Sequence, residues 1–368
     1  MTIEEEIKSI EGEIRNTPYN KATSHHIGRL KAKLARLRDE LQKQAASKSG
    51  HVGRGYGIKK SGHATIVMVG FPSVGKSTLL NHLTGTSAEV AAYDFTTLEV
   101  IPGTLEYKGT RLQILDVPGL IQGAAAGRGH GKEVLSIMRN ADLILIIVDI
   151  FHLEQYAILV QELYNAGIRI NVRPPDVPIH KLTRGGIAIS STVELNQGID
   201  ERMIRAVLSE YRIHNADVLI REKITLDELI DVVTGNREYL RAITVINKTD
   251  LADTDTRSKC RKRFPDAILI SAEQSLKLDT LKERIYKELG FIRIYMKPQG
   301  APPDMANPLV MRVDSTVADV CSAIHREFTE RFRYAQIWGP SGKHAGQHVG
   351  LSHLLVDGDV VRVVLRKR

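Results

Sequence analysis

Residues 70–78 read GFPSVGKST, in which two glycines enclose a short loop and a lysine and two hydroxyl side chains follow. The loop comes directly after the apolar run 65–69 and before an apolar-periodic segment, which gives the order strand, loop, helix start. Backbone amides in such a loop favour a phosphate, Lys76 would neutralise its charge, and the Ser77 hydroxyl would bind Mg²⁺. The motif alone predicts a nucleoside triphosphate site, for ATP or GTP, formed by Gly70, Phe71, Pro72, Ser73, Val74, Gly75, Lys76, Ser77 and Thr78.

Two further segments supply groups that a triphosphate site needs. Asp116 follows the apolar run 112–115 and would hold Mg²⁺ through water, and the Gly119 amide would reach the γ-phosphate. Thr97 would complete the Mg²⁺ shell when the triphosphate is bound, which would make the segment Phe95-Thr96-Thr97 a switch that senses the γ-phosphate. We therefore expect Mg²⁺ ligands at Ser77, Thr97 and Asp116, and catalytic contributions from Lys76, Thr97 and Gly119.

A fourth segment indicates which base is bound. Asn247-Lys248-Thr249-Asp250 follows the apolar run 242–246, and a carboxylate at Asp250 accepts hydrogen bonds from both guanine N1–H and N2–H. Adenine offers neither donor in that arrangement, so the motif favours GTP. Ser271-Ala272, after the run 268–270, would support the base further. Because these motifs occur in the right order and each follows a strand signal, we prefer a GTP site to a set of unrelated surface loops.

Length and composition limit the class of protein. A chain of 368 residues is long enough for roughly two to four domains with ample cores. Cys260 and Cys321 make neither a disulfide scaffold nor a four-ligand zinc site, which favours reduced thiols in the cytosol. The longest apolar run, 143–148, is too short to span a bilayer, and the first residues lack the features of a signal peptide. We expect a cytoplasmic protein that has no membrane partner.

Positive charge is concentrated near the N-terminus. Residues 15–60 carry twelve Lys and Arg against Asp39 and Glu40, whereas residues 1–14 carry five Glu against one Lys. Ile and Leu recur at spacings of three and four in both segments, which predicts a helical hairpin followed by a glycine- and arginine-containing linker. The cations beside the apolar stripe of the second helix form either a solvated face or a contact to RNA phosphates; they are Arg29, Lys31, Lys33, Arg36 and Arg38.

The rest of the chain alternates strands and helices. We predict a doubly wound α/β domain with strands at 65–69, 98–101, 111–116, 143–149, 242–247 and 267–270. The long interval between Asp149 and Asn247 predicts an inserted subdomain, and a strand, a helix over 317–330 and further strands after residue 292 predict a small β-grasp module. The expected divisions are 1–60, 61–169, 170–236, 237–292 and 293–368.

With these motifs the chain resembles the developmentally regulated GTP-binding proteins, a branch of the Obg-related GTPases. The stretches that carry the resemblance are 70–78, 91–98 and 116–121, together with the more family-specific 20–26 and 211–217. Residues 349–353 and 357–361 are similar to the end of TGS domains in threonyl-tRNA synthetases and stringent-response enzymes. The resemblance covers nearly the whole chain and implies a P-loop GTPase domain with an insert, an N-terminal helical region and a C-terminal TGS domain.

The resemblance also implies partners. It associates the protein with translating ribosomes or ribosomal RNA and, in eukaryotic relatives, with a stabilising partner protein, and it gives no reason to expect DNA binding.

Ras-like enzymes orient the attacking water with a Gln where this chain has Leu120, so we expect slow intrinsic hydrolysis. A partner, Arg128 in cis or a monovalent cation such as K⁺ would then supply stimulation, although Ser73 stands where K⁺-dependent relatives have Asn, and Gln122 is a further candidate.

Two functions of different classes follow from these observations. The first is a Mg²⁺-dependent GTPase that hydrolyses GTP to GDP and phosphate and acts as a ribosome-associated switch. The alternative is a GTP-dependent scaffold for RNA or the ribosome, in which nucleotide is a structural ligand and turnover is negligible. A tRNA-modifying or tRNA-charging enzyme lacks support, because the sequence shows no second active-site constellation.

Overall fold

The computed structural model describes residues 2–18, 23–48, 62–84, 100–117, 137–196 and 199–366. These residues fall into two compact units, one within 1–56, 120–139 and 160–240 and the other within 57–119, 140–159 and 241–368. None of the helices that the structure describes combines the length and the apolar character needed to cross a bilayer.

The second unit is built around a largely parallel sheet with the strand order β10-β9-β4-β1-β3-β2. Neighbouring strands are parallel except β2, which runs antiparallel to β3. Val245 and Ile246 are successive residues of β9 and belong to different core clusters, so helices cover both faces of this sheet. The strands are β1 (Ala64–Val69), β2 (Ile101–Tyr107), β3 (Thr110–Asp116), β4 (Leu143–Asp149), β9 (Glu238–Asn247) and β10 (Ile268–Leu269), and β5 (Ile168–Ile170) pairs with the first residues of β9.

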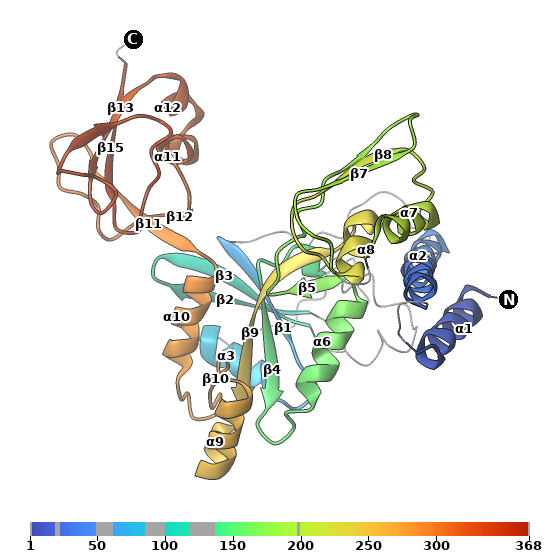
Figure 1. The fold of residues 1–368 in the computed structure, drawn as a ribbon. Coiled ribbons are helices and arrows are strands. Elements are labelled where there is room, and N and C mark those ends of the chain that lie inside the picture. The colour runs from blue at the N-terminus through green and yellow to red at the C-terminus, as the bar shows by residue number, and fades with distance from the viewer. Residues whose placement is uncertain are drawn as a thin grey trace. The chain divides into compact units, whose positions relative to one another are not determined.

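Helices α3 (Lys76–Thr84) and α10 (Leu278–Glu288) share one core cluster with the sheet through Leu80 and Leu281. On the opposite face, Cys260 of α9 (Thr254–Arg263) packs with Ile246. The α/β architecture predicted from the alternation of strand and helix signals is therefore confirmed (Figure 1).

The position of β2 differs from the sequence prediction. The structure places the strand at Ile101–Tyr107, not at 98–101, and so includes Pro102 and Gly103, two residue types that usually weaken strands. Among the described strands β2 lies at the edge of the sheet, where proline is tolerated. Gly103 has a packing reason, since a Cβ there would lie 2.6 Å from Thr84 Cγ2 and 2.8 Å from Leu80 Cδ1 of α3.

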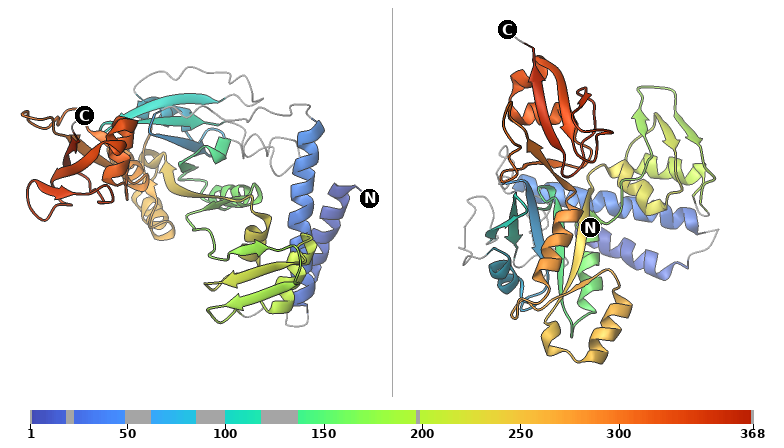
Figure 2. Two further views of the ribbon diagram at one scale, coloured as in Figure 1. Left: turned by 90° about the horizontal axis from the view of Figure 1, so that it is seen from above. Right: turned by 90° about the vertical axis from the view of Figure 1, so that its left-hand side faces the viewer.

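The first unit contains the predicted helical hairpin. Helices α1 (Ile3–Asn16) and α2 (Ser24–Lys48) are in contact, and the Thr2 hydroxyl and the Glu5 carboxylate cap the start of α1 in a reciprocal pair of hydrogen bonds. Helix α2 also packs against α7 (Glu201–Glu210) and α8 (Leu226–Thr234) (Figure 2). Ala32 is fully buried in their core. A separate three-stranded sheet lies beside α7 and α8; its order is β6-β8-β7, with β6 (Ile179–Lys181), β7 (Ile187–Ser191) and β8 (Ala216–Ile220). Helix α6 (Gln155–Asn165) precedes β5.

The C-terminal residues form the expected β-grasp module. Its sheet has the order β12-β11-β15-β13-β14, and the core beneath it includes Val320 and Cys321 of α11. The helix predicted over 317–330 is two helices, because the His325 backbone is extended and its ring accepts a hydrogen bond from the Glu327 amide. The elements are β11 (Phe291–Met296), β12 (Leu309–Arg312), α11 (Val317–Ile324), α12 (Arg326–Glu330), β13 (Phe332–Trp338), β14 (Gln347–Val349) and β15 (Val360–Leu365).

A candidate nucleotide-binding site at the carboxyl edge of the sheet

The predicted phosphate-binding loop connects the end of β1 to the start of α3. The Lys76 ammonium donates to the Gly70 carbonyl and to the Phe71 carbonyl, both at 3.1 Å, so its charge is held over the loop. Burial lowers the pKa of Lys76, an effect that the nearby Asp116 carboxylate opposes. Ser73 has a left-handed backbone with φ 62°, which turns the loop back towards the helix. Val74 is buried in the core, so its side chain anchors the loop and does not line a ligand site.

Ser77 and Asp116 meet where β3 ends beside α3. The Ser77 hydroxyl donates to Asp116 Oδ2 at 2.9 Å, and Asp116 Oδ1 is buried without a hydrogen-bond partner in the part of the chain that the structure describes. Burial raises the pKa of the Asp116 carboxyl, while Lys76 and the Ser77 hydroxyl act to lower it. An orphaned carboxylate oxygen beside a hydroxyl and an ammonium group is a costly arrangement that a bound cation would satisfy. Oxygen donors of this kind suit Mg²⁺.

Asn247 joins the base-recognition motif to the phosphate-binding loop. Its side-chain amide donates to the Val74 carbonyl at 2.9 Å and accepts from the Ala272 amide, also at 2.9 Å. Gly75, with φ +92°, lies so close to this side chain that a Cβ there would come within 2.4 Å of Asn247 Nδ2. The three segments 70–78, 247–250 and 271–272, which are far apart in sequence, are therefore fixed to one another.

Lys248 and Asp250 differ in their surroundings. Lys248 has a left-handed backbone, and its ammonium group pairs with Asp149 Oδ2 at 2.7 Å. Asp149 is buried, and its Oδ1 accepts from the Phe151 amide. Asp250 is half-buried, and its side chain makes no hydrogen bond or ion pair with the residues described in the structure. The Asp250 carboxylate is thus available for a ligand, whereas Lys248 is held in place by its ion pair with Asp149.

Ser271 and Ala272, which were predicted to support the base, lie in a tight turn. The Ser271 hydroxyl is fully buried and accepts from the Gln274 amide at 3.1 Å, so it supports the turn and not a base directly. The Ala272 amide is the group that contacts Asn247. Thr249, between the predicted ligands, anchors the motif by donating its hydroxyl to the Ile270 carbonyl at 2.8 Å.

Several predicted site residues lie outside the described residues. They are Phe95, Thr96, Thr97 and Gly119, together with Leu120, Gln122 and Arg128. Their roles stay predictions. The described residues bring together the loop, Ser77, Asp116 and the Asn247–Asp250 motif. Within the described ranges, no group of three or more His, Cys, Asp or Glu side chains is arranged to hold a metal ion, so a cation here would depend on the mixed oxygen donors of this site.

The sequence allowed two explanations for five cations of α2, a solvated face or a contact to RNA phosphates. The structure shows a third arrangement, in which these cations form ion pairs. Each of the five has a carboxylate partner: Arg29 with Glu210, Lys31 with Asp227, Lys33 with Glu6, Arg36 with Glu40 and Arg38 with Glu11. The charge of these five side chains is therefore neutralised locally. Such pairs hold the hairpin against its neighbours and leave less free charge for RNA than the sequence suggested.

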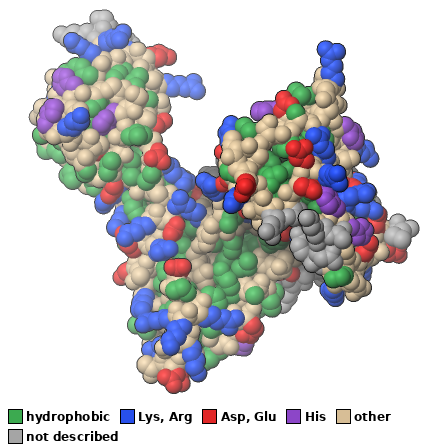
Figure 3. Space-filling model, in the orientation of Figure 1, with side chains coloured by type: hydrophobic (Ala, Val, Ile, Leu, Met, Phe, Trp, Pro, Cys, Tyr) green, Lys and Arg blue, Asp and Glu red, His purple; other side chains and the backbone are tan. Residues whose placement is uncertain are grey.

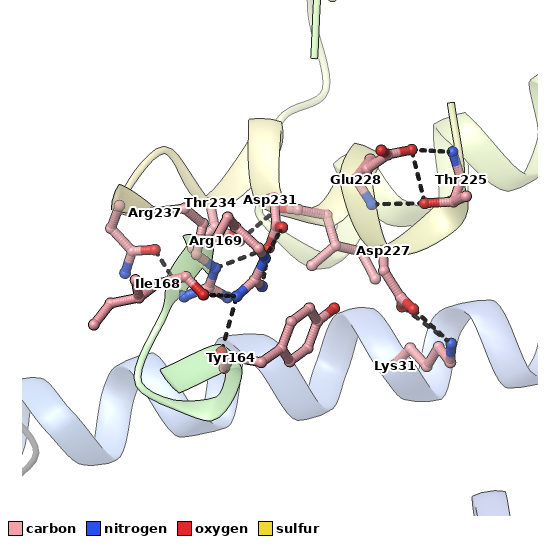
Figure 4. Close-up of polar contacts among 12 residues, drawn as sticks. Lys31, Tyr164, Ile168, Arg169, Thr225, Asp227, Glu228, Asp231, Thr234 and Arg237 are labelled. Atoms are coloured by element: carbon pink, nitrogen blue, oxygen red, sulfur yellow. Dashed lines mark hydrogen bonds and ion pairs between the residues drawn. The ribbon is translucent and has the colours of Figure 1, made fainter. Parts of the chain in front are cut away.

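Sequence reasoning missed two groups of polar residues. Asp149, the partner of Lys248, stands at the end of β4, and the rule that ligands bind at the carboxyl ends of parallel strands was a signal for it. The second group is a buried network in the first unit, drawn in part in Figure 4. Arg169 donates to both oxygens of Asp231 at 2.6 and 2.7 Å, its guanidinium lies 3.6 Å from the centre of the Tyr164 ring, and Arg237 contacts both Asp231 and Asp39.

Three protein-family models match successive parts of the chain from residue 65 to residue 365. A model described as "50S ribosome-binding GTPase" matches residues 65–181, one described as "C-terminal region of MMR_HSR1 domain" matches 184–291, and the TGS domain model matches 292–365. The P-loop GTPase and TGS assignments expected from the sequence are confirmed.

Full-length relatives give the same result. An uncharacterised GTP-binding protein of Methanocaldococcus jannaschii is 56% identical over 100% of this chain and 94% of its own. Developmentally-regulated G-protein 2 of Arabidopsis thaliana is 44% identical over 100% and 92%, and Ribosome-interacting GTPase 1 of Saccharomyces cerevisiae is 47% identical over 99% of each chain. Apart from these sequence relatives, the chain is also similar to a solved GTP-binding protein of Pyrococcus horikoshii, over 82% of this chain and 100% of that one, with a TM-score of 0.39 and 13% identity.

A parallel α/β sheet with a phosphate-binding loop and a guanine-type motif at its carboxyl edge defines a P-loop GTP-binding protein. This chain belongs to the developmentally regulated GTP-binding proteins of the Obg-related GTPases, with a C-terminal TGS domain.

Proposed function

We propose that this protein is a Mg²⁺-dependent GTPase that hydrolyses GTP slowly on its own and acts as a cytoplasmic, ribosome-associated switch. The observation that carries the proposal is the cluster of Lys76, Ser77 and Asp116, in which a buried carboxylate oxygen has no partner among the described residues. A buried charge in this state is poorly satisfied until a cation and phosphates are present.

The proposed roles follow from the positions of the groups. Lys76 and the amides of 70–78 would bind the phosphates, with Lys76 exchanging its two carbonyl contacts for phosphate oxygens. Ser77 and Thr97 would hold Mg²⁺ directly and Asp116 through water, and the bound ion would neutralise charge on the β- and γ-phosphates. The Gly119 amide would contact the γ-phosphate. Lys76, Thr97 and Gly119 are the proposed catalytic groups.

Guanine selection is assigned to Asp250. Its half-buried carboxylate is unpaired among the described residues, and two adjacent acceptor oxygens match guanine N1–H and N2–H. Asn247 and Ala272 fix the motif against the loop, and Lys248 is held by Asp149. Ser271 contributes through the turn.

The name of the yeast relative and the description of the first family model support a ribosomal partner. The proposed divisions are a basic N-terminal region at 1–60, the GTPase domain at 61–169 and 237–292, an inserted subdomain at 170–236 and the TGS domain at 293–368. We propose that the TGS domain and the N-terminal region contact the ribosome and that a stabilising protein is a further partner. Leu120 in place of a water-orienting Gln is the reason for the proposed slow intrinsic rate.

Single-turnover GTP hydrolysis tests the proposal. The purified protein is measured alone and with ribosomes, in K⁺ and in Na⁺ buffers, with and without Mg²⁺. Hydrolysis that requires Mg²⁺ and accelerates with ribosomes supports the switch, and acceleration by K⁺ would identify the cation as the stimulant. A near-zero rate under every condition, with tight GTP binding retained, would support the scaffold alternative instead.

Asp250→Asn is the matched control. The amide replaces one acceptor by a donor, so GTP affinity is expected to fall while xanthosine triphosphate, which has a carbonyl at C2 in place of the amine, is accepted. A variant that keeps its preference for GTP would contradict the assignment of Asp250.

A further inference from the structure

A groove of about 670 Å³ lies in the C-terminal module, alongside the second half of β15. Its walls come from the turn after β11, from α12 and from β15 itself. The groove is separate from the nucleotide site, so the inference below does not depend on the proposed function.

One edge of β15 is open along this groove. β13 pairs with β15 from Val360 to Leu365, but β11 pairs only with Val360 and Val361. The Asp359 and Val361 carbonyls accept from β11 and its following residue, whereas the Arg366 amide donates towards the β13 side. Because backbone groups alternate along a strand, those of Val363 and Leu365 point to the β11 side, where no strand that the structure describes continues the ladder.

The groove is strongly cationic. Five of its lining residues are Lys or Arg, and none is acidic: Lys297, Arg331, Arg333, Arg362 and Arg366. Only Arg331 has a carboxylate partner within the described part of the chain, Glu327 at 4.0 Å. Lys and Arg side chains are visible beside the C-terminal end of the module in Figure 3. This differs from Arg29, Lys31, Lys33, Arg36 and Arg38 of α2, each of which has a carboxylate partner.

Apolar side chains lie among these charges. Ile324 is 39% exposed, and Phe328, Val363 and Leu365 also line the groove. A site for a phosphate backbone alone needs neither an open strand edge nor an apolar floor, whereas an extended peptide uses both. Alternate residues of such a peptide point in opposite directions, so one set can meet the apolar floor and the other the cations.

We propose that this groove binds an extended acidic segment of a partner protein, which adds to the open edge of β15 as a further strand. Backbone hydrogen bonds to Val363 and Leu365 supply the register, and charge complementarity to the five cations selects an acidic sequence. Strand addition at an unprotected edge also explains how a short segment gains a defined orientation.

Fluorescence anisotropy with the full-length protein tests the charge requirement. The probe is a fluorescein-labelled peptide of alternating Glu and Val, compared with the same peptide carrying a central Pro. Arg333→Glu/Arg366→Glu reverses two exposed groove cations and should weaken binding by about tenfold or more, since each reversed charge removes one attraction and adds a repulsion. Lys343→Glu/Lys259→Glu makes the same charge change at exposed sites outside the groove and should leave affinity nearly unchanged.

Hydrogen exchange tests the strand-addition geometry. Bound peptide should slow exchange of the amides in a fragment covering residues 360–366, and the Pro-containing peptide should bind weakly and give little protection. Oligouridylate RNA is the competing probe. Binding of RNA without binding of the peptide, equal losses in the groove and control variants, or peptide binding without protection of these amides would each overturn the proposal.

Discussion

Replacing Gly75 by alanine tests how closely the phosphate-binding loop and the base-recognition motif are joined. Gly75 has φ +92°, a backbone conformation that a side chain disfavours, and a Cβ there would lie 2.4 Å from Asn247 Nδ2. No real contact is that short, so Asn247 must move. It would then give up its 2.9 Å hydrogen bonds with the Val74 carbonyl and the Ala272 amide.

The expected cost has two parts. The left-handed backbone should cost alanine about 1–2 kcal/mol relative to glycine. Loss of two hydrogen bonds at a buried amide adds about 1–3 kcal/mol, at a net of roughly 0.5–1.5 kcal/mol for each bond. We therefore expect Gly75→Ala to destabilise the nucleotide-free GTPase domain by about 2–5 kcal/mol and to weaken GTP binding as well.

Gly358→Ala is the matched control. Gly358 also has φ +92°, but no atom lies within 4 Å of the position its Cβ would occupy, so only the backbone cost of about 1–2 kcal/mol applies. Urea unfolding followed by far-ultraviolet circular dichroism measures both variants. Trp338, the one tryptophan in the chain, reports the C-terminal module separately and should shift for Gly358→Ala but not for Gly75→Ala.

A double-mutant cycle with Asn247→Ala isolates the contact. In that background the clash is absent, so Gly75→Ala should cost only the backbone part. Equal destabilisation by Gly75→Ala and Gly358→Ala, or an unchanged cost of Gly75→Ala in the Asn247→Ala background, would refute the argument that Asn247 makes Gly75 obligatory.

Three further outcomes are expected. Arg237→Gln leaves the buried Asp39 carboxylate without a cation, while Asp231 keeps Arg169, and should destabilise the first unit by about 3–5 kcal/mol. The exposed Arg241→Gln should cost about 1 kcal/mol or less in the same thermal unfolding assay, and similar costs for the two variants would contradict the assigned burial. Burial raises the pKa of Asp116, so the charged form of this carboxyl opposes folding at neutral pH. Nucleotide-free Asp116→Asn should therefore be at least as stable as the parent at pH 7, and the difference in stability should shrink as pH falls through the raised pKa, whereas Mg²⁺-dependent nucleotide binding should drop. A large loss of stability at pH 7 would count against this argument. Hydrogen bonds from Arg293 lower the pKa of Asp357 from 3.8, so this pair stabilises the fold above that pH, and its contribution disappears as pH falls through the lowered pKa. When stability is followed by Trp338 fluorescence, Asp357→Asn should therefore reduce the loss of stability seen at acid pH. An unchanged loss would exclude the pair as its source.

Most of the fold could be predicted from local patterns in the sequence. Buried parallel strands such as β1 and β4 are continuous apolar runs, and each predicted motif follows one of them. The predicted strand at 98–101 was wrong. The observed strand β2 includes Pro102 and Gly103, because an edge position tolerates the proline and contact with α3 requires the glycine. The His325 break was invisible because a histidine carries no strong breaker signal.

What the sequence by itself determined is the class of site. The chemistry of a phosphate loop and of a guanine-selecting carboxylate depends on a few residues that are adjacent in the chain, so their types and spacing suffice. Only the tertiary structure decided which charges are free. The partners of Lys31, Arg169 and Lys248 lie 196, 62 and 99 residues away, and no periodic pattern encodes contacts at such separations. The same physics explains why five cations of α2 are paired with carboxylates while the groove beside β15 keeps cations without a carboxylate partner among the described residues. Pairing depends on which surfaces folding brings together, and that is a property of the packed chain.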